Sequence, residues 1–302
     1  MINWLEQLRE VAPEAAFLQN EPMSRHTTFQ VGGPATLFVE PKTVDELTAL
    51  AGCCRKKEIP HYILGKGSNL LVGDKGYDGV MLHLGSELAA CQVDGERIYA
   101  EAGISLAQLA KQACAAGLTG LEFAAGIPGS LGGAVTMNAG AYGGEMKDVL
   151  TAVQVLTEAG DLIWLTPEQM RMGYRTSAVP EEHYVVTAAE FQLKDGCIET
   201  IKERMAELAA MRRAKQPLEY PSAGSTFKRP AGYFAGKLIQ DTGLSGFSVG
   251  GAQVSEKHCG FVINRGDATA SDILSLCREV AQRVREKFGV ELEMEIRCLG
   301  EF

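Results

Sequence analysis

The sequence lacks several features that would place it in a specialised class of protein. No stretch approaches the ~18 to 20 uninterrupted apolar residues of a membrane helix, and the chain starts without the basic and apolar segments of a secretory signal. The eight cysteines show no Cys-x-x-Cys spacing, and the five histidines are scattered along the chain without a cluster typical of a metal site. We therefore expect a soluble, cytoplasmic protein without a membrane segment, a metal site or a disulfide framework.

Basic residues are also in short supply. The chain carries 29 Lys and Arg against 38 Asp and Glu, a formal net charge of −9, which argues against a nucleic-acid partner. A local basic site for a small anionic molecule stays open. With 302 residues the chain is long enough for two or three domains.

Helical and strand-like segments alternate along the chain. Capping signals and apolar spacing predict helices at residues 44 to about 58 behind the Thr43–Glu46 box, 106–117 behind the Ser105–Gln108 box, 201–216, and about 272–288. Runs typical of strands cover residues 61–64, 70–72, 153–155, 162–165, 184–186 and 291–299. The first half mixes helices and strands, residues 150–193 are rich in strands, and a domain boundary is expected at residues 194–199.

Residues 126–144 contain seven glycines and no charged side chain before Glu145. Glycine loses much conformational entropy on folding, so a dense cluster indicates sharp turns or close approach of the main chain to a ligand. A large cofactor is one interpretation. Tight turns at the rim of a β-rich domain are the other.

A second glycine turn, Gly65-Lys-Gly-Ser-Asn69, follows a predicted strand. It does not fit a Rossmann turn, because the third glycine is missing and the next residues, Leu70 to Val72, do not open a helix. It is not a P-loop either, since no glycine stands at the required position before a Gly-Lys-Ser/Thr unit.

Ser225 and Glu295 are candidates for proton chemistry. Ser225 follows a glycine in a loop but lacks the G-x-S-x-G elbow of a hydrolase. Two interpretations stay open for its hydroxyl: it donates a proton in a reaction, or it caps a turn. Glu295 lies in an alternating segment that places it with Glu291 and Glu293 on the polar face. The pattern therefore does not distinguish it from those two, or from a solvated strand residue.

Cationic candidates complete the set. Arg175, after the Gly173-Tyr174 turn, could hold a carboxylate or stabilise an enolate, or form a surface ion pair. The residues Lys215, Lys228, Arg229 and Lys237 surround the Ser225 loop in sequence and could neutralise a diphosphate, or be solvated. Cys259 is expected to be a small buried residue.

Taken in order, these segments resemble one family along nearly the whole chain. The motifs are RHTTF at 25–29, VGGPA at 31–35, LGKGSNLL at 64–71, AGIPGSLGGAVTMNAGAYG at 125–143, GYR at 173–175, AGSTF at 223–227, AGKLI at 235–239, VSEKH at 254–258 and EIR at 295–297. The chain resembles the flavin-dependent UDP-N-acetylenolpyruvoylglucosamine reductases of bacterial cell-wall synthesis. The short spacing from Arg175 to Phe191 resembles the branch that lacks the substrate-covering tyrosine loop.

The resemblance implies an α+β protein with an FAD-binding fold of the vanillyl-alcohol-oxidase (PCMH) type. Two FAD-binding subdomains, residues 1–78 and 79–198, would precede a C-terminal substrate-binding domain at 199–302, whose last strand could return to the FAD domain. FAD would be held without a covalent bond, and its expected contacts are Gly65, Lys66, Gly67, Ser68, Asn69, Gly126, Ile127, Pro128, Gly129, Ser130, Gly132, Gly133, Asn138, Ala139, Gly140 and Tyr142.

The resemblance also implies a reaction. NADPH would reduce the flavin, and hydride would pass from the flavin to the enolpyruvyl ether of a UDP-sugar. Arg175 and Glu295 would stabilise the enolate-like centre, and Ser225 would protonate it to give UDP-N-acetylmuramate. Lys215, Lys228, Arg229 and Lys237 would contact the substrate, and a monomer is expected.

Two other functions stay open. The chain could be another FAD-linked oxidase or dehydrogenase of the same superfamily, although its two glycine loops contain neither the histidine nor the cysteine of a covalent flavin link. It could also be a non-catalytic sugar-nucleotide sensor, against which the joint presence of Arg175, Ser225 and Glu295 argues. Arg229 stands where many family members have asparagine, so a substrate contact there is expected to differ.

Overall fold

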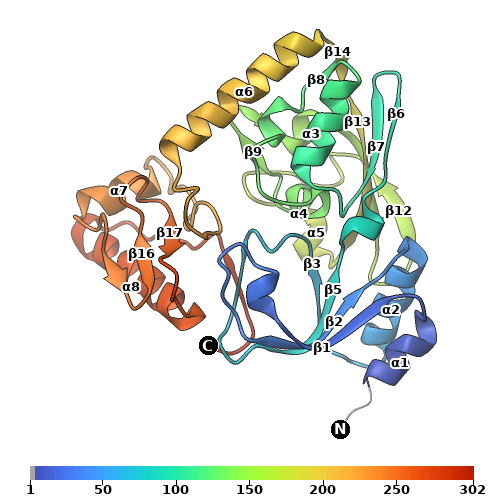
Figure 1. The fold of residues 1–302 in the computed structure, drawn as a ribbon, viewed down its shortest axis with the longest axis horizontal. Coiled ribbons are helices and arrows are strands. Elements are labelled where there is room, and N and C mark those ends of the chain that lie inside the picture. Colours follow the sequence, from blue (N-terminus) through green and yellow to red (C-terminus); the bar gives the residue numbers. More distant parts are fainter. Residues whose placement is uncertain (1–3) are drawn as a thin grey trace. The chain divides into compact units, whose positions relative to one another are not determined.

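The structure is a computed structural model and describes residues 4–302 (Figure 1). The chain divides into two compact units. Unit 1 contains the chain up to residue 18, residues 37–66 and residues 79–211, and unit 2 contains residues 19–36, 67–78 and 212–302. Both units are thus assembled from separated segments, and the three-domain division expected from the sequence stays a prediction.

A four-stranded sheet has the strand order β1-β2-β5-β3. Strands β3 (His61–Leu64) and β5 (Tyr77–His83) are parallel, and Leu64 is paired with His83. The other two strands are β1 (Ala16–Pro22) and β2 (Pro34–Glu40). This register fixes the point at which the chain leaves β3 and enters the Gly65 turn.

Helices α1 (Trp4–Val11) and α2 (Val44–Lys56) lie next to each other in unit 1 (Figure 1). The side chain of Thr43 accepts the expected bond from Glu46 N at 3.1 Å, but the Glu46 carboxylate accepts from Lys42 N rather than from Thr43 N. The predicted capping box is therefore only half formed. The helix also ends two residues earlier than residue 58, because Glu58 has a φ of 53°, outside the helical region.

The predicted β-rich region, residues 150–193, supplies three strands of an antiparallel five-stranded sheet in unit 1, and residues 91–101 supply the other two. Its order is β12-β11-β13-β7-β6, with β6 at Cys91–Asp94, β7 at Arg97–Glu101, β11 at Leu150–Leu156, β12 at Leu162–Leu165 and β13 at Val185–Gln192. Helix α3 (Leu106–Ala115) begins at a complete capping box, in which Ser105 and Gln108 each bond the other's backbone N–H. That prediction is confirmed.

Shorter elements and one long helix complete this part of the chain. They are α4 (Leu131–Thr136), α5 (Ala178–Glu181), the paired strands β9 (Gly140–Ala141) and β10 (Gly144–Glu145), the paired strands β8 (Leu118–Thr119) and β14 (Lys194–Asp195), and α6 (Ile198–Lys215). The long α6 begins three residues before its predicted start at 201. The glycine-rich segment 126–144 is therefore a series of turns around one short helix.

In unit 2, helix α8 (Ala270–Phe288) packs on the three-stranded sheet β15-β16-β17 (Figure 1). It begins at a capping box between Thr269 and Asp272 and ends at Gly289, whose φ is 69°. The three strands are Ser248–Val249, Ala252–Val254 and Val262–Asn264, and α7 (Ala235–Asp241) contacts α8. The strong cap signals explain why this helix is predicted nearly to its ends.

The last strand differs from its prediction. Only β18 (Arg297–Leu299) forms, parallel to β4 (Leu70–Val72). The prediction is wrong over residues 291–296, where a single bridge pairs Met294 with Phe227. The apolar face of the predicted alternation does face the core, since Leu292 and Ile296 are buried and Met294 is half-buried against it.

Each unit has its own hydrophobic core. Cys54 lies in the core of unit 1 and Cys277 in that of unit 2, and burial raises the pKa of each thiol to about 12. Cys259 is buried, as expected, whereas Cys197 and Cys298 are exposed. Most of the thiols are therefore packing residues.

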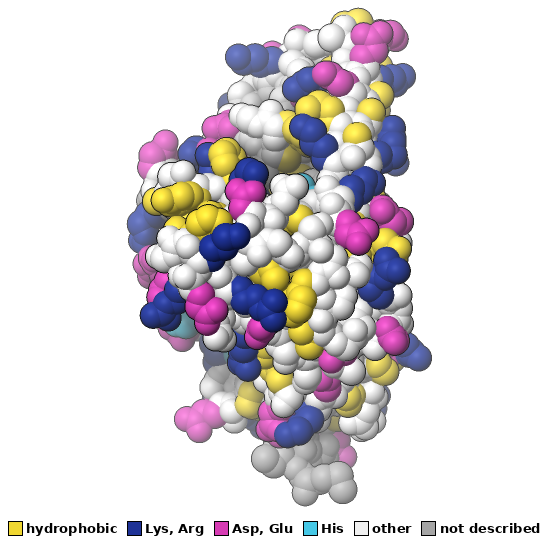
Figure 2. Space-filling view, turned by 90° about the vertical axis from the view of Figure 1, so that its left-hand side faces the viewer, with side chains coloured by type: hydrophobic (Ala, Val, Ile, Leu, Met, Phe, Trp, Pro, Cys, Tyr) yellow, Lys and Arg dark blue, Asp and Glu magenta, His cyan; other side chains and the backbone are white. Residues whose placement is uncertain are grey.

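The surface carries charges of both signs. Figure 2 shows Lys and Arg side chains interspersed with Asp and Glu over the face in view, so the negative net charge is not gathered there into one field. Among residues 4–302, no helix is both long and apolar enough to cross a membrane.

Candidate active site

The two predicted cofactor loops meet in unit 1. A Cβ on Gly65 would lie less than 3.0 Å from Ser130 Oγ and 3.4 Å from Ser130 Cβ, and Ser130 itself is 2% exposed. Ser130 is held by a bridge to Ser105 at the start of α3. Only glycine at position 65 permits this approach, so the structure brings together two segments that lie far apart in the sequence.

Several residues of the glycine-rich segment have left-handed backbone conformations. Asn138 has a φ of 41°, Tyr142 of 54° and Gly143 of 91°. Gly140 packs against the main chain at Gly144, where a Cβ would come within 2.7 Å of the carbonyl oxygen. Tyr142 remains 39% exposed. The segment thus presents peptide groups and one aromatic ring, as a cofactor contact requires, while its glycines are also needed for tight turns.

Arg175 lies in a tight turn of unit 1. Gly173 and Thr176 exchange backbone hydrogen bonds of 3.0 and 3.4 Å around it, and Arg175 has a φ of 55°. Its guanidinium carbon is 5.6 Å from the centre of the Tyr174 ring, and Arg175 is half-buried. The turn therefore constrains the main chain from which this cation projects.

Ser225 is held in unit 2 through the buried residue that follows it. Thr226 is fully buried; its N–H donates to Gly260 O at 2.9 Å, its carbonyl accepts from Glu295 N at 2.8 Å, and its hydroxyl accepts from Val262 N at 3.0 Å. Ser225 itself is exposed. A rigid backbone therefore carries a solvent-accessible hydroxyl, and the buried hydroxyl of Thr226 is a contributor that the sequence pattern did not single out.

Glu295 belongs to the same part of unit 2. It is half-buried, whereas Glu291 and Glu293 are exposed, so the structure separates three residues that alternation alone could not distinguish. Its N–H bonds Thr226 O, and its carbonyl accepts from Asn69 Nδ2 at 3.0 Å. The main chain of Glu295 is thus fixed to the segment that follows Ser225.

The predicted substrate cations already have intramolecular contacts. Lys228 forms an ion pair with Glu293, Lys237 forms one with Asp241 at 2.6 Å, and the Arg229 guanidinium lies 3.9 Å from the Phe234 ring centre. Lys215 lies at the end of α6 and is exposed. Binding of a diphosphate by either paired lysine would therefore exchange one anionic partner for another.

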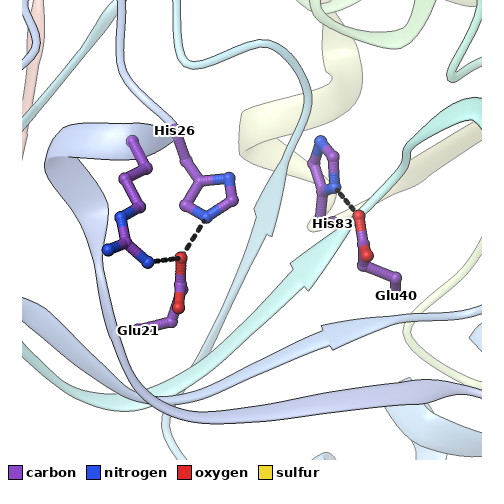
Figure 3. A network of polar contacts seen from close by, with 5 residues as sticks. Glu21, His26, Glu40 and His83 are labelled. Carbon is purple, nitrogen blue, oxygen red and sulfur yellow. Dashed lines mark hydrogen bonds and ion pairs between the residues drawn. The ribbon is translucent and has the colours of Figure 1, made fainter.

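Two histidine–carboxylate pairs were not anticipated from the sequence. His26 Nε2 lies 3.0 Å from Glu21 Oε1 in unit 2, and His83 Nδ1 lies 2.7 Å from Glu40 Oε1 in unit 1 (Figure 3). The partners are 5 and 43 residues apart in the sequence, so a pattern of helical spacing does not reveal them. Within residues 4–302 there is no group of three His, Cys, Asp or Glu side chains suited to a metal ion.

The main chain at His26 also shapes the second half of the Gly65–Asn69 turn. Gly67 has a φ of 58°, and a Cβ there would collide with the carbonyl oxygen of His26. The amide of Thr28 donates to Gly67 O at 3.2 Å. The RHTTF motif thus supports the turn through its main chain, a role that the residue types of the motif do not indicate.

Comparison with known proteins gives the family. Residues 35–166 match the model of the FAD binding domain, and residues 216–299 match that of the UDP-N-acetylenolpyruvoylglucosamine reductase C-terminal domain. The UDP-N-acetylenolpyruvoylglucosamine reductase of Caldanaerobacter subterraneus subsp. tengcongensis is 52% identical over 98% of both chains. The enzyme of the same name from Clostridium botulinum strain Hall is 50% identical over 99% of this chain and 97% of its own.

Solved structures agree with this fold. The crystal structure of UDP-N-acetylenolpyruvylglucosamine reductase from Thermus caldophilus has a TM-score of 0.80 at 38% identity, over 95% of this chain and 99% of its own. A Phl p 4 variant described as a glucose oxidase has a TM-score of 0.51 at 14% identity over 65% of this chain and 44% of its own, a likeness of fold alone. The expected FAD-binding fold of the vanillyl-alcohol-oxidase (PCMH) type with an added C-terminal domain is thereby confirmed, and the chain belongs to the UDP-N-acetylenolpyruvoylglucosamine reductase family.

Proposed function

We propose that this protein reduces UDP-N-acetylglucosamine-enolpyruvate to UDP-N-acetylmuramate, with NADPH as reductant and non-covalent FAD as cofactor. Family membership supports an FAD-dependent oxidoreductase of peptidoglycan precursor synthesis. The structural observation that carries the proposal is the meeting of the Gly65 turn with Ser130. We further propose a cytoplasmic monomer without a nucleic-acid partner, with domains at 1–78, 79–198 and 199–302.

The residues present fit FAD. Glycine at 65 lets the main chain of the first loop lie directly against Ser130 of the second, and Gly143 has open space at its Cβ position. Main-chain N–H groups in such turns suit phosphate oxygens. We assign FAD contacts to the two loops, residues 65–69 and 126–142, with the exposed ring of Tyr142 at the end of the second. FAD, when bound, supplies the hydride-transfer chemistry.

The proposed roles of the protein side chains follow from charge. Hydride addition to the methylene carbon of the enolpyruvyl group leaves an electron pair on the carbon next to the carboxylate. The permanent positive charge of Arg175 stabilises that centre. Glu295 can assist only as a protonated hydrogen-bond donor, because an ionised carboxylate would repel the developing charge.

Ser225 is proposed as the proton donor. Its hydroxyl is a weak acid and donates only to a strongly basic centre, which the carbanion is. The proton forms the new C–H bond and leaves a serine oxyanion, which solvent reprotonates. The exposed position of Ser225 supports both access to substrate and this return of the proton.

The substrate's diphosphate would be neutralised by Lys215, Lys228, Arg229 and Lys237. Lys228 and Lys237 would exchange their carboxylate partners for phosphate oxygens, and exposed ion pairs of this kind contribute only ~0 to 1 kcal/mol. The exchange is therefore inexpensive in free energy. Arg229 would act from its stacked position on Phe234.

The test separates the two half-reactions by anaerobic stopped-flow absorbance. Ser225→Ala should leave flavin reduction by NADPH nearly unchanged and slow reoxidation by the enolpyruvyl substrate by ~10²- to 10⁴-fold, since general acid catalysis contributes that much. Ser248→Ala, an exposed serine of the same unit, is the matched control and should change neither rate. Equal losses in both half-reactions of the Ser225 variant would remove the proton-donor assignment.

A further inference from the structure

Asn138 is in the cofactor segment, but its side chain is already committed to protein groups. It is 1% exposed; its Nδ2 donates to Glu145 Oε2 at 2.7 Å and to Gly173 O at 3.1 Å, and its Oδ1 accepts from Lys147 N at 3.0 Å. An asparagine amide has two N–H donors. Both are used here, so the side chain has no donor left for a cofactor.

The hydrogen bond from Asn138 to Gly173 O links the cofactor segment to the turn that carries Arg175. Gly173 opens the turn that carries Arg175. The far side of the turn is tied as well, because the buried Ser177 donates its hydroxyl to Thr136 O, at the end of α4, at 2.8 Å. The Arg175 turn is therefore held at both ends by the segment predicted to bind FAD.

The other cofactor loop shows the same arrangement in unit 2. Asn69 Nδ2 donates to Glu295 O at 3.0 Å, and Asn69 O accepts from Arg297 N at 2.9 Å. In each unit, one asparagine of a glycine-rich loop thus bonds the main chain of a residue proposed for catalysis, Glu295, or of the residue two positions before one, Gly173.

We infer that Asn138 and Asn69 are positioning residues that couple the cofactor loops to Arg175 and Glu295. Ordering of a loop by FAD would then order the attached turn, because a hydrogen bond from a buried amide fixes the position of the carbonyl that it contacts. This inference rests on the proposed function for the roles of Arg175 and Glu295. Its structural part, the coupling of loop to turn, can be measured without turnover.

The main variant is Asn138→Gly, which removes the amide yet suits the left-handed φ of 41°. Asn20→Gly is its matched control, since Asn20 is exposed and has a φ of 52°. In hydrogen–deuterium exchange of the apoprotein, added FAD should slow exchange at residues 173–176 by about tenfold in the unmodified and Asn20→Gly proteins. In Asn138→Gly that protection should be lost.

Single-turnover rates supply a second readout. Asn138→Gly with bound FAD should keep its rate of reduction by NADPH within about threefold and lose about tenfold or more in reoxidation by substrate. In the double variant with Arg175→Lys, Asn138→Gly should slow reoxidation little further, because both changes disrupt the same set of connected contacts. Equal slowing of both half-reactions, full additivity with Arg175→Lys, or unchanged protection by FAD would overturn the inference.

Failure of the coupling can be distinguished from misfolding of the variant and from failure of the proposed function. If Asn138→Gly does not fold, Asn69→Ala tests the same coupling in unit 2, because it removes the bond to the Glu295 carbonyl; the protection by FAD is then read at residues 293–297. If the unmodified protein is not reoxidised by substrate, the proposed function fails. FAD-induced protection of residues 173–176 that depends on Asn138 would still support the coupling.

Discussion

Adding one methyl group at Gly65 should separate the two cofactor loops. The new Cβ of Gly65→Ala would lie less than 3.0 Å from the buried Ser130 Oγ. Overpacking of this kind costs ~1 to 3 kcal/mol. If the cost falls on the FAD-binding conformation, affinity should drop by ~5- to 150-fold, at about 1.4 kcal/mol per factor of ten.

A second substitution tests whether that contact is the cause. Ser130→Ala removes the obstructing oxygen and leaves the two Cβ atoms 3.4 Å apart, a tight but tolerable separation. The double variant Gly65→Ala/Ser130→Ala should therefore recover most of the lost affinity. Ser130→Ala alone should bind FAD within a few-fold of the unmodified protein.

The assay is titration of the apoprotein with FAD, followed by flavin fluorescence, alongside thermal unfolding. Gly52→Ala is the control, because a Cβ at Gly52 meets nothing within 4 Å and lies inside α2. It should raise stability by ~0.5 to 1 kcal/mol and leave FAD affinity unchanged. Unchanged affinity of Gly65→Ala, or no recovery in the double variant, would refute the reasoning.

Three other predictions concern stability and reactivity. Gly289→Ala should destabilise the protein by ~1 kcal/mol in urea unfolding, because the C-cap has a φ of 69°; an unchanged midpoint would contradict this. The backbone N–H groups of Thr269 and Gly251 donate to the Asp272 carboxylate and lower its pKa. The ionised carboxylate therefore stabilises the folded protein above the ordinary carboxyl pKa, and this stabilisation is lost as the pH falls through the lowered pKa. Asp272→Asn should thus cost stability at pH 7 and progressively less as the pH falls below the ordinary carboxyl pKa, and a difference that does not change with pH would argue otherwise. Cys197, which is exposed, should react with Ellman's reagent at pH 8 in the folded protein, whereas Cys54, with its pKa raised to about 12, should react only after unfolding.

Local signals predict the helices well. The Ser105–Gln108 box begins α3 as predicted, and α8 lies within two residues of its expected bounds. At Thr43 the box is incomplete because Lys42 N competes for the Glu46 carboxylate. Such competition between neighbouring donors has no clear sequence signal.

Contacts between residues far apart in the chain could not be predicted from the sequence. Glu295 is half-buried, unlike Glu291 and Glu293, and its backbone bonds Thr226 and Asn69, residues far away in the chain. The division into units built from separated segments has the same origin. Local patterns make Ser225, Glu295 and Arg175 candidates, the motif resemblance assigns their roles, and the backbone contacts that hold them are seen only in the fold.

The most direct test of the proposed function is an anaerobic absorbance titration of the FAD-loaded protein. NADPH should bleach the flavin band, and UDP-N-acetylglucosamine-enolpyruvate added in stoichiometric amount should restore it without oxygen, with UDP-N-acetylmuramate as product. A flavin that bleaches but recovers only when oxygen is admitted would contradict the account and indicate an oxidase.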